Sequence, residues 1–129
     1  MFLKEEKITR DATSYQDPHL IIHFQRQRVE LDGATLTLTR KEYDLLAMLS
    51  QNAGEIVPRD VLLKQVWGYC EGIRTRTLDV HIRRLRKKLE PFSDKYIETI
   101  FGIGYRFQPF RPRTAPYEMQ NRMAVSAIA

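Results

Sequence analysis

The sequence has almost no cysteine and no long apolar run. Its 129 residues include one cysteine, Cys70, so neither an internal disulfide nor a cysteine-built zinc site can form. Apolar runs are only a few residues long, whereas a membrane-spanning helix needs roughly 20 apolar residues. The N-terminal residues MFLKEEKITR are rich in charge and lack the apolar segment of a secretory signal. We therefore expect a cytoplasmic protein without a membrane segment.

Motifs of catalysis and metal binding are also missing. The sequence contains no P-loop, no Ser–His–Asp or Cys–His grouping and no paired carboxylates in a recognisable frame. His19 and His23 are four residues apart, but they fall in a strand pattern rather than on a helix, so we expect no metal site. The sequence thus predicts neither an enzyme nor a bound cofactor.

Positive charge, by contrast, is concentrated in one part of the chain. The net charge is +5, from 21 Lys or Arg against 16 Asp or Glu. Residues 73–113 contain eleven basic and four acidic residues, whereas the other 88 residues contain ten basic and twelve acidic ones. A basic segment on an otherwise weakly acidic chain is typical of nucleic-acid binding.

Hydropathy with a period of two predicts short strands in the N-terminal third. Apolar residues alternate at Leu20, Ile22, Phe24, Val29, Leu31, Leu36 and Leu38. Asp32-Gly33 between two of these stretches is typical of a tight hairpin. Residues 1–18 are polar and aperiodic, and residues 109–129 are rich in proline and small side chains, so both are expected to be flexible tails. The folded domain is therefore predicted over residues 19–108.

Two helices are predicted next. Thr39 and Glu42 match a capping box at the start of the first, and Asn52-Ala53-Gly54 ends it. Residues 55–57 form a brief extended link. Pro58 suits the first turn of the second helix, which ends at Gly68.

A third helix over about 75–90 combines a narrow apolar stripe with a basic outer face. The stripe consists of Leu78, Ile82, Leu85 and Leu89. A hairpin over 96–107 follows, in which Gly102 and Gly104 permit positive φ at the tip. This order predicts an α+β fold of the winged helix-turn-helix type, with an N-terminal antiparallel sheet, a three-helix core and a C-terminal β-hairpin wing. In that layout the basic helix fits the DNA major groove and the hairpin lies beside it.

Three segments carry a family resemblance: LTRKEYDLLAMLSQNAGEIVPRDVLLKQVWG, RTRTLDVHIRRLRKKLEP and YIETIFGIGYRF. In this order and spacing they resemble the DNA-binding effector domain of the OmpR/PhoB family of bacterial response regulators, over about residues 20–108. The resemblance implies a four-stranded N-terminal sheet and a role in phosphorelay signalling as a sequence-specific transcriptional regulator. It also implies head-to-tail dimers on direct-repeat half-sites of double-stranded DNA.

The resemblance assigns roles to individual residues. It implies phosphate or sugar contacts by Trp67, Arg76, Thr77, His81, Arg86 and Tyr105, and groove-facing positions for Asp79, Arg83 and Arg84. Arg84 is the best candidate for a base contact, and Lys87 and Arg106 complete the predicted DNA-binding set. The loop that contacts RNA polymerase in some relatives corresponds to Tyr69, Cys70, Glu71, Gly72, Ile73 and Arg74.

Several roles have a second interpretation. Asp79 either forms an ion pair with Arg83 one turn later or contacts cytosine directly. His81 is either a phosphate contact or a partly buried helix residue, and Trp67 is in the first place a core residue. A different function is also open: a winged helix that contacts RNA polymerase or another regulator without binding DNA. The basic outer face favours DNA.

The chain departs from the family pattern at three places. No receiver domain fits into residues 1–18, so phosphorylation control within this chain is not expected. Pro58 occupies a position where many relatives have Ser, so the cap of the second helix must come from elsewhere. Phe101 lies near the wing tip, where some relatives have Arg.

Overall fold

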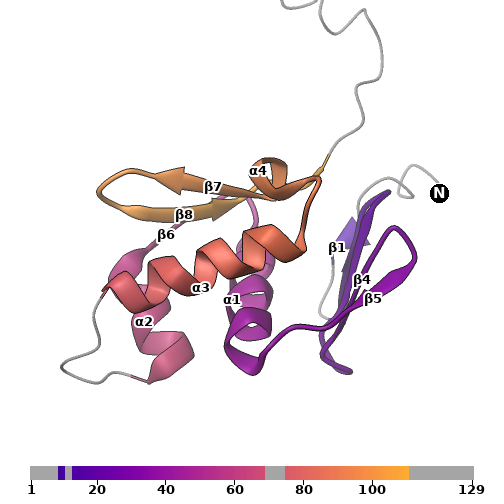
Figure 1. Ribbon diagram of the computed structural model, residues 1–129, viewed down its shortest axis with the longest axis horizontal. Coiled ribbons are helices and arrows are strands. Elements are labelled where there is room, and N and C mark those ends of the chain that lie inside the picture. Colours follow the sequence, from indigo (N-terminus) through magenta and orange to yellow (C-terminus); the bar gives the residue numbers. More distant parts are fainter. Residues whose placement is uncertain (1–8, 11–12, 69–74, 111–129) are drawn as a thin grey trace, which may run out of the picture.

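The computed structural model describes residues 9–10, 13–68 and 75–110, which form two antiparallel sheets around a helical core (Figure 1). The predicted α+β winged helix-turn-helix architecture is confirmed. The N-terminal sheet packs at one end of the helices, and the C-terminal hairpin lies along them on another side. None of the helices in the described ranges is long and apolar enough to cross a membrane.

The N-terminal sheet is a meander of antiparallel strands. Its strands, in spatial and sequence order, are β1 (Thr9–Arg10), β2 (Ser14–Gln16), β3 (Leu20–His23), β4 (Arg28–Leu31) and β5 (Ala34–Leu36). Leu20 pairs with Leu31 and Ile22 pairs with Val29, and all four side chains are buried. The alternation in the sequence therefore marks the core face of this sheet.

The Asp32-Gly33 hairpin is confirmed. Leu31 and Ala34 pair directly across it, and the two residues between them have φ of 51° and 85°. Positive φ at both central positions is the geometry of the type I′ turn, whose twist matches that of the flanking strands.

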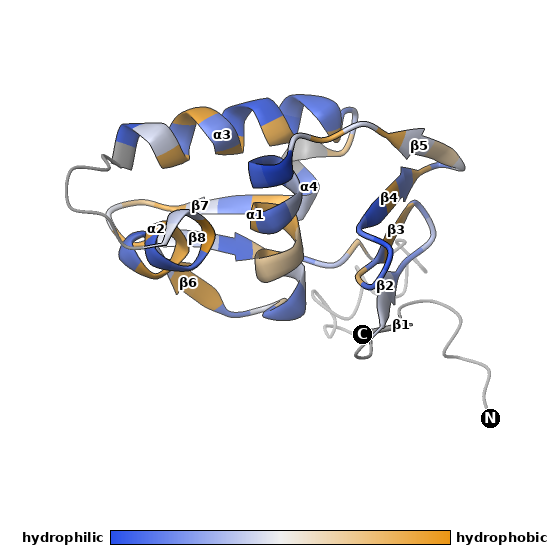
Figure 2. Ribbon diagram, turned by 90° about the horizontal axis from the view of Figure 1, so that it is seen from below, coloured by the Kyte–Doolittle hydropathy of each residue, from blue (hydrophilic) through white to orange (hydrophobic). Residues whose placement is uncertain are grey.

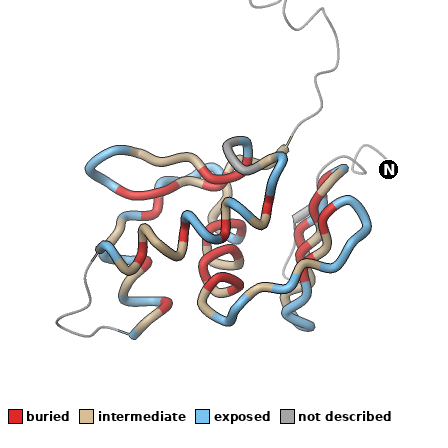
Figure 3. Tube along the Cα trace, viewed as in Figure 1, coloured by how far each residue is buried: buried red, intermediate tan, exposed pale blue. Residues whose placement is uncertain are grey.

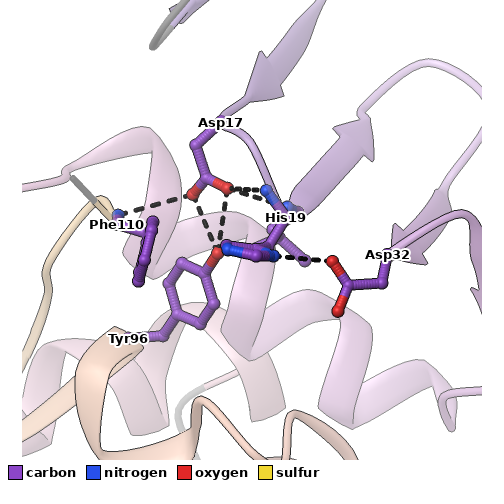
Figure 4. Close-up of polar contacts among 6 residues, drawn as sticks. Asp17, His19, Asp32, Tyr96 and Phe110 are labelled. Atoms are coloured by element: carbon purple, nitrogen blue, oxygen red, sulfur yellow. Dashed lines mark hydrogen bonds and ion pairs between the residues drawn. The ribbon is translucent and has the colours of Figure 1, made fainter. Parts of the chain in front are cut away.

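The expected N-terminal tail over residues 1–18 is wrong for residues 13–18. Strand β2 pairs with β3, and both Tyr15 and Asp17 are buried. The Asp17 carboxylate accepts hydrogen bonds from the backbone N–H of His19 at 2.7 Å and from the hydroxyl of Tyr96 at 2.9 Å (Figure 4). Tyr96 lies 79 positions along the chain, so local hydropathy contains no sign of this burial.

The expected C-terminal tail is also shorter than predicted. Phe110 is half-buried, with its ring 4.6 Å from that of His19 and 5.7 Å from that of Phe92. Its backbone N–H donates to Asp17. The tail predicted from residue 109 therefore packs against the N-terminal sheet at least as far as Phe110.

Three helices form the core. They are α1 (Arg40–Gln51), α2 (Arg59–Trp67) and α3 (Thr75–Lys88), and their inward apolar side chains are buried (Figure 3). The capping box of α1 is confirmed: the Glu42 N–H donates to the Thr39 hydroxyl at 3.2 Å, and the Thr39 N–H donates to the Glu42 carboxylate at 3.0 Å. Buried Glu42 also pairs with Lys88 at 2.7 Å, which joins α1 to the end of α3.

The wing is part of a three-stranded sheet rather than a free hairpin. Strands β7 (Ile97–Ile100) and β8 (Gly104–Phe107) follow the short helix α4 (Ser93–Tyr96). The stretch expected as an extended link is strand β6 (Ile56–Pro58), which pairs with β8. The expectation of positive φ holds for Gly102, at 79°, but not for Gly104. Gly104 is needed for a different reason, since a Cβ there would lie 2.1 Å from the Val57 carbonyl oxygen.

This sheet also supplies the cap that Pro58 cannot provide. Pro58 is the N-cap of α2 and makes no side-chain capping bond. Instead, the backbone N–H of Arg59 donates to the carbonyl of Ile103 in the wing turn, at 2.9 Å. The first turn of α2 is thereby fastened to the wing.

Candidate nucleic-acid interface

Helix α3 separates an apolar face from a cationic one. Leu78, Ile82 and Leu85 are at most 1% exposed and pack into the core. The outer face is hydrophilic (Figure 2) and presents the exposed side chains of Arg76, Arg83, Arg84 and Lys87. These four cations make no hydrogen bond or ion pair with any residue that the structure describes. They are therefore available to an anionic partner.

A shallow cleft lies between α3 and strand β8. Its volume is about 430 Å³, and its lining consists of Arg76, Asp79, Val80, Arg83, Arg86 and Tyr105. The wing and the basic helix thus share one surface.

Asp79 joins α2, α3 and the wing at the floor of this cleft. Its carboxylate accepts a hydrogen bond from the Arg59 guanidinium at 2.6 Å and another from the Tyr105 hydroxyl at 2.5 Å. The expected ion pair between Asp79 and Arg83 is therefore wrong, because Arg59, 20 positions earlier, takes that place. Burial raises the pKa of Asp79, but the bonds from Tyr105 and Arg59 outweigh burial and hold it below its usual value.

Tyr105 is buried between two guanidinium groups. Arg59 and Arg86 lie 5.4 and 5.7 Å from the centre of its ring. Burial, followed by the bond to the Asp79 carboxylate, raises the pKa of Tyr105 to about 12. The hydroxyl remains protonated near neutral pH and donates its proton to Asp79.

Two of the predicted DNA contacts, Arg86 and Arg106, are engaged within the chain. Arg86 donates to the Ile97 carbonyl at 2.8 Å and to the Thr99 hydroxyl at 2.7 Å. Arg106 pairs with Glu98 across the wing at 2.9 Å. Hydrogen bonds from Gln108 and Arg106 lower the pKa of Glu98, so that this pair is ionised at neutral pH. These arginines fasten the wing to α3 and its two strands to each other.

The remaining predicted contacts form a small group at the junction of α2 and α3. Trp67 and Thr77 are partly exposed, and the Trp67 ring packs edge-on against His81 at 5.1 Å. The Nδ1–H of His81 donates to the Thr77 carbonyl at 2.8 Å, which leaves Nε2 for another partner. His81 therefore combines the two expected roles, a half-buried helix residue and a candidate donor. The predicted loop from Tyr69 to Arg74 lies outside the described residues.

Comparison with known families identifies this arrangement. Residues 33–107 match the family described as "Transcriptional regulatory protein, C terminal". The structure also resembles a Thermotoga maritima OmpR/PhoB homologue, the response regulator DrrB, with a TM-score of 0.68 and 34% sequence identity. The chain belongs to the OmpR/PhoB family. Its members contain DNA-binding domains of transcriptional regulators and are not enzymes.

Relatives of this OmpR/PhoB domain include both longer proteins and isolated domains. The response regulator ArlR of Staphylococcus aureus is 46% identical over 79 residues, which are 60% of this chain and 36% of ArlR. DrrB is matched over 74% of this chain and 44% of DrrB. The DNA-binding domain of Klebsiella pneumoniae RstA, solved in complex with the RstA box, is 34% identical with a TM-score of 0.59, over 81% of this chain and 99% of that domain. The chain thus spans about a third of the length of ArlR and nearly all of an isolated effector domain.

Sequence reasoning missed one residue of the OmpR/PhoB interface, Arg59. It lies on α2, outside the basic segment, and neither its spacing nor its neighbours link it to Asp79. Only the packing of α2 against α3 brings the two side chains together. The exposed cations of α3, by contrast, all follow from the hydropathy pattern of that helix.

Proposed function

We propose that this chain binds double-stranded DNA sequence-specifically, with α3 in the major groove and the β7–β8 hairpin as a wing beside it. In this role it is the effector domain of a two-component response regulator. The observation that carries the proposal is the row of four exposed cations on α3 that have no partner in the described part of the chain. An α-helix fits the major groove, and cations on its outer face reach phosphates and base edges there.

The four cations divide between two roles. Arg76 and Arg83 line the cleft beside the wing, and with Lys87 they contact phosphates. Arg84 does not line the cleft, and its guanidinium contacts a base edge, most favourably guanine O6 and N7. Phosphate contacts fix the register of the helix on DNA, whereas the base contact supplies specificity.

The other predicted residues fall into two groups. Trp67, Thr77 and His81 flank the helix and contact the sugar–phosphate backbone through their free polar atoms. Arg86, Asp79, Tyr105 and Arg106 act within the domain, since their polar groups already have partners there. We assign these four to positioning α3 and the wing.

The domain binds tandem direct-repeat half-sites as a head-to-tail pair. The family resemblance supports this arrangement, and the complex of the RstA domain with the RstA box supports DNA as the partner. Contact with RNA polymerase through residues 69–74 is a further part of the proposal, and it concerns residues outside those described.

A salt titration tests the proposal. The chain is titrated with duplex DNA between about 50 and 200 mM salt; contact with about 5 to 7 phosphates predicts a slope of log K against log salt near −5 to −6. Arg40→Ala is the matched control, since it removes an exposed cation on α1 that pairs with Asp44, and it should leave the slope unchanged. A slope near zero, or no binding at the lowest salt, would instead favour a winged helix that contacts only proteins.

A further inference from the structure

The wing tip carries an exposed aromatic side chain with no cation near it. Phe101 is 88% exposed and Ile103 is 49% exposed, with Gly102 between them. The other phenylalanines in the described ranges are buried or half-buried. From Ile97 to Tyr105 the wing contains no Lys or Arg. The tip therefore offers apolar surface at the place where a cationic contact would be expected beside DNA.

The tip is held in a defined position. The Ile103 N–H donates to the Ile100 carbonyl at 2.9 Å, and the Ile103 carbonyl accepts from the Arg59 N–H at 2.9 Å. Next to it, Gly104 pairs with Pro58 and packs closely on the Val57 carbonyl. Exposure of Phe101 on a turn fastened in this way costs solvation without the compensation of free movement.

The tip continues the surface that carries the α3 cations. Tyr105 lines the cleft with Arg76 and Arg83, and its strand partner is Thr99. Phe101 lies two residues beyond Thr99, roughly 7 Å further along the strand direction. Because a phosphate backbone separates the two grooves of DNA, a hairpin that runs past the phosphates beside α3 reaches the adjacent minor groove, which is about 6 Å wide.

We propose that Phe101, supported by Ile103, packs into the minor groove next to the α3 site and contacts sugars and base edges through apolar surface alone. This inference rests on the proposed function, because it places the tip on DNA that α3 has already bound. Apolar side chains are known to act in this groove, where aromatic and aliphatic wedges contact or part base steps. The contact releases no condensed counterions, so it contributes affinity that does not depend on salt.

The test compares variants at Phe101 on a duplex with one half-site. Phe101→Ala should weaken binding about 5- to 20-fold, because part of a phenylalanine side chain returns to water, and the salt slope should stay as in the unmodified chain. Phe101→Arg should make the slope steeper by about 0.9, since it adds a cation at the phosphates. Ile56→Ala is the matched control, an apolar side chain that is 40% exposed on the same sheet but away from the tip, and it should change neither quantity.

Hydroxyl-radical footprinting locates the contact, because the radicals attack sugars from the minor groove. The unmodified chain should protect minor-groove sugars beside the half-site, and Phe101→Ala should lose that protection while keeping the protection due to α3. Unchanged single-site affinity of Phe101→Ala would overturn the inference. Loss of cooperative binding to tandem sites alone would show instead that the tip contacts a second copy. Failure of the unmodified chain to bind DNA would remove the proposed function and this inference together.

Discussion

The basic side chains of this domain are of two kinds at the residue scale. Some are bound within the fold: Arg59 by Asp79, Arg86 by Ile97 and Thr99, and Lys88 by Glu42. The others project from α3 without partners among the described residues. A bound guanidinium must lose its existing hydrogen bonds before it can contact DNA, whereas an unpartnered one exchanges only water. This difference assigns DNA contact to the second group.

Arg84 and Arg76 should differ in what they contribute to binding. Arg84→Ala should lose about 1–3 kcal/mol on the preferred site and relax the choice of base there, because it removes a base contact. Arg76→Ala should weaken binding to all duplexes about equally and make the salt slope shallower by about 0.9. Competition binding with preferred and random duplexes measures both effects. Equal losses on the two duplexes for Arg84→Ala would contradict its assignment.

The bond between Asp79 and Tyr105 should contribute to stability. Asp79→Ala leaves the buried Tyr105 hydroxyl and the Arg59 guanidinium without their acceptor, so the free energy of unfolding should fall by about 1–3 kcal/mol. A double-mutant cycle with Tyr105→Phe in urea should give a coupling of about 0.5–3 kcal/mol. Because the pKa of Asp79 is lowered on folding, this contribution is present at neutral pH and is lost as the pH falls below 3.8.

The exposed pair of Asp44 with Arg40 is the control for this cycle. Asp44→Ala removes a surface ion pair at one-turn spacing and should cost less than about 0.5 kcal/mol. Additive effects of Asp79→Ala and Tyr105→Phe would show that the two groups do not support each other.

At the scale of the elements, the wing and α2 form one joint. Strand β6 leads directly into α2 and pairs with β8, and the turn of the wing caps the first amide of α2. The helix that precedes the recognition helix is therefore oriented by the wing as well as by the core. A change at the β6–β8 contact should alter the angle between wing and helices, not the hairpin alone.

The two wing glycines should respond differently to alanine. In Gly104→Ala the new Cβ would collide with the Val57 carbonyl at 2.1 Å, so the β6–β8 pairing must shift and the loss should exceed about 2 kcal/mol. In Gly102→Ala nothing lies within 4 Å of the new Cβ, and only the positive φ of 79° opposes it, at about 1 kcal/mol. Thermal unfolding of both variants, with DNA binding measured beside it, gives the comparison. A larger loss for Gly102→Ala would contradict this account of the joint.

At the scale of the whole molecule, both ends of the described chain meet at Asp17. Tyr96 and Phe110 donate to its carboxylate from the C-terminal side, and the Tyr15 ring packs edge-on against Phe107 at 5.2 Å. The N-terminal sheet is therefore fastened directly to the segment that carries the wing. A partner that docks on this sheet would be coupled mechanically to the DNA-binding face.

Pairs of domains on DNA should depend on helical phase. Two half-sites about one helical turn apart place two copies on the same side of the duplex, where head-to-tail contact gives a cooperativity of about 1–2 kcal/mol. Insertion of half a turn between the half-sites should abolish the cooperative step in a gel-shift series and leave single-site binding unchanged. Cooperativity that survives this rotation would mean that the two copies do not touch.

Much of the local structure could be predicted from short stretches of sequence. The capping box at Thr39, the Asp32-Gly33 hairpin and the apolar stripe of α3 depend on interactions within a few residues, so the pattern contains its own explanation. The exposed cations of the candidate site follow in the same way, because they occupy the face of α3 opposite its stripe. The order of these elements was then sufficient to identify a winged helix.

The tertiary structure alone decided what depends on distant neighbours. Asp79 was expected to pair with Arg83 on its own helix, but the packing of α2 brings Arg59 closer. Residues 14–17 appeared to belong to a polar tail, but Tyr96 and Phe107 cover Tyr15 and Asp17. The role of Gly104 depends on a carbonyl in another strand. Sequence by itself determines which faces and turns a segment can form, and only the fold determines which partner each polar group finds, because hydrogen bonds and close packing depend on position in space.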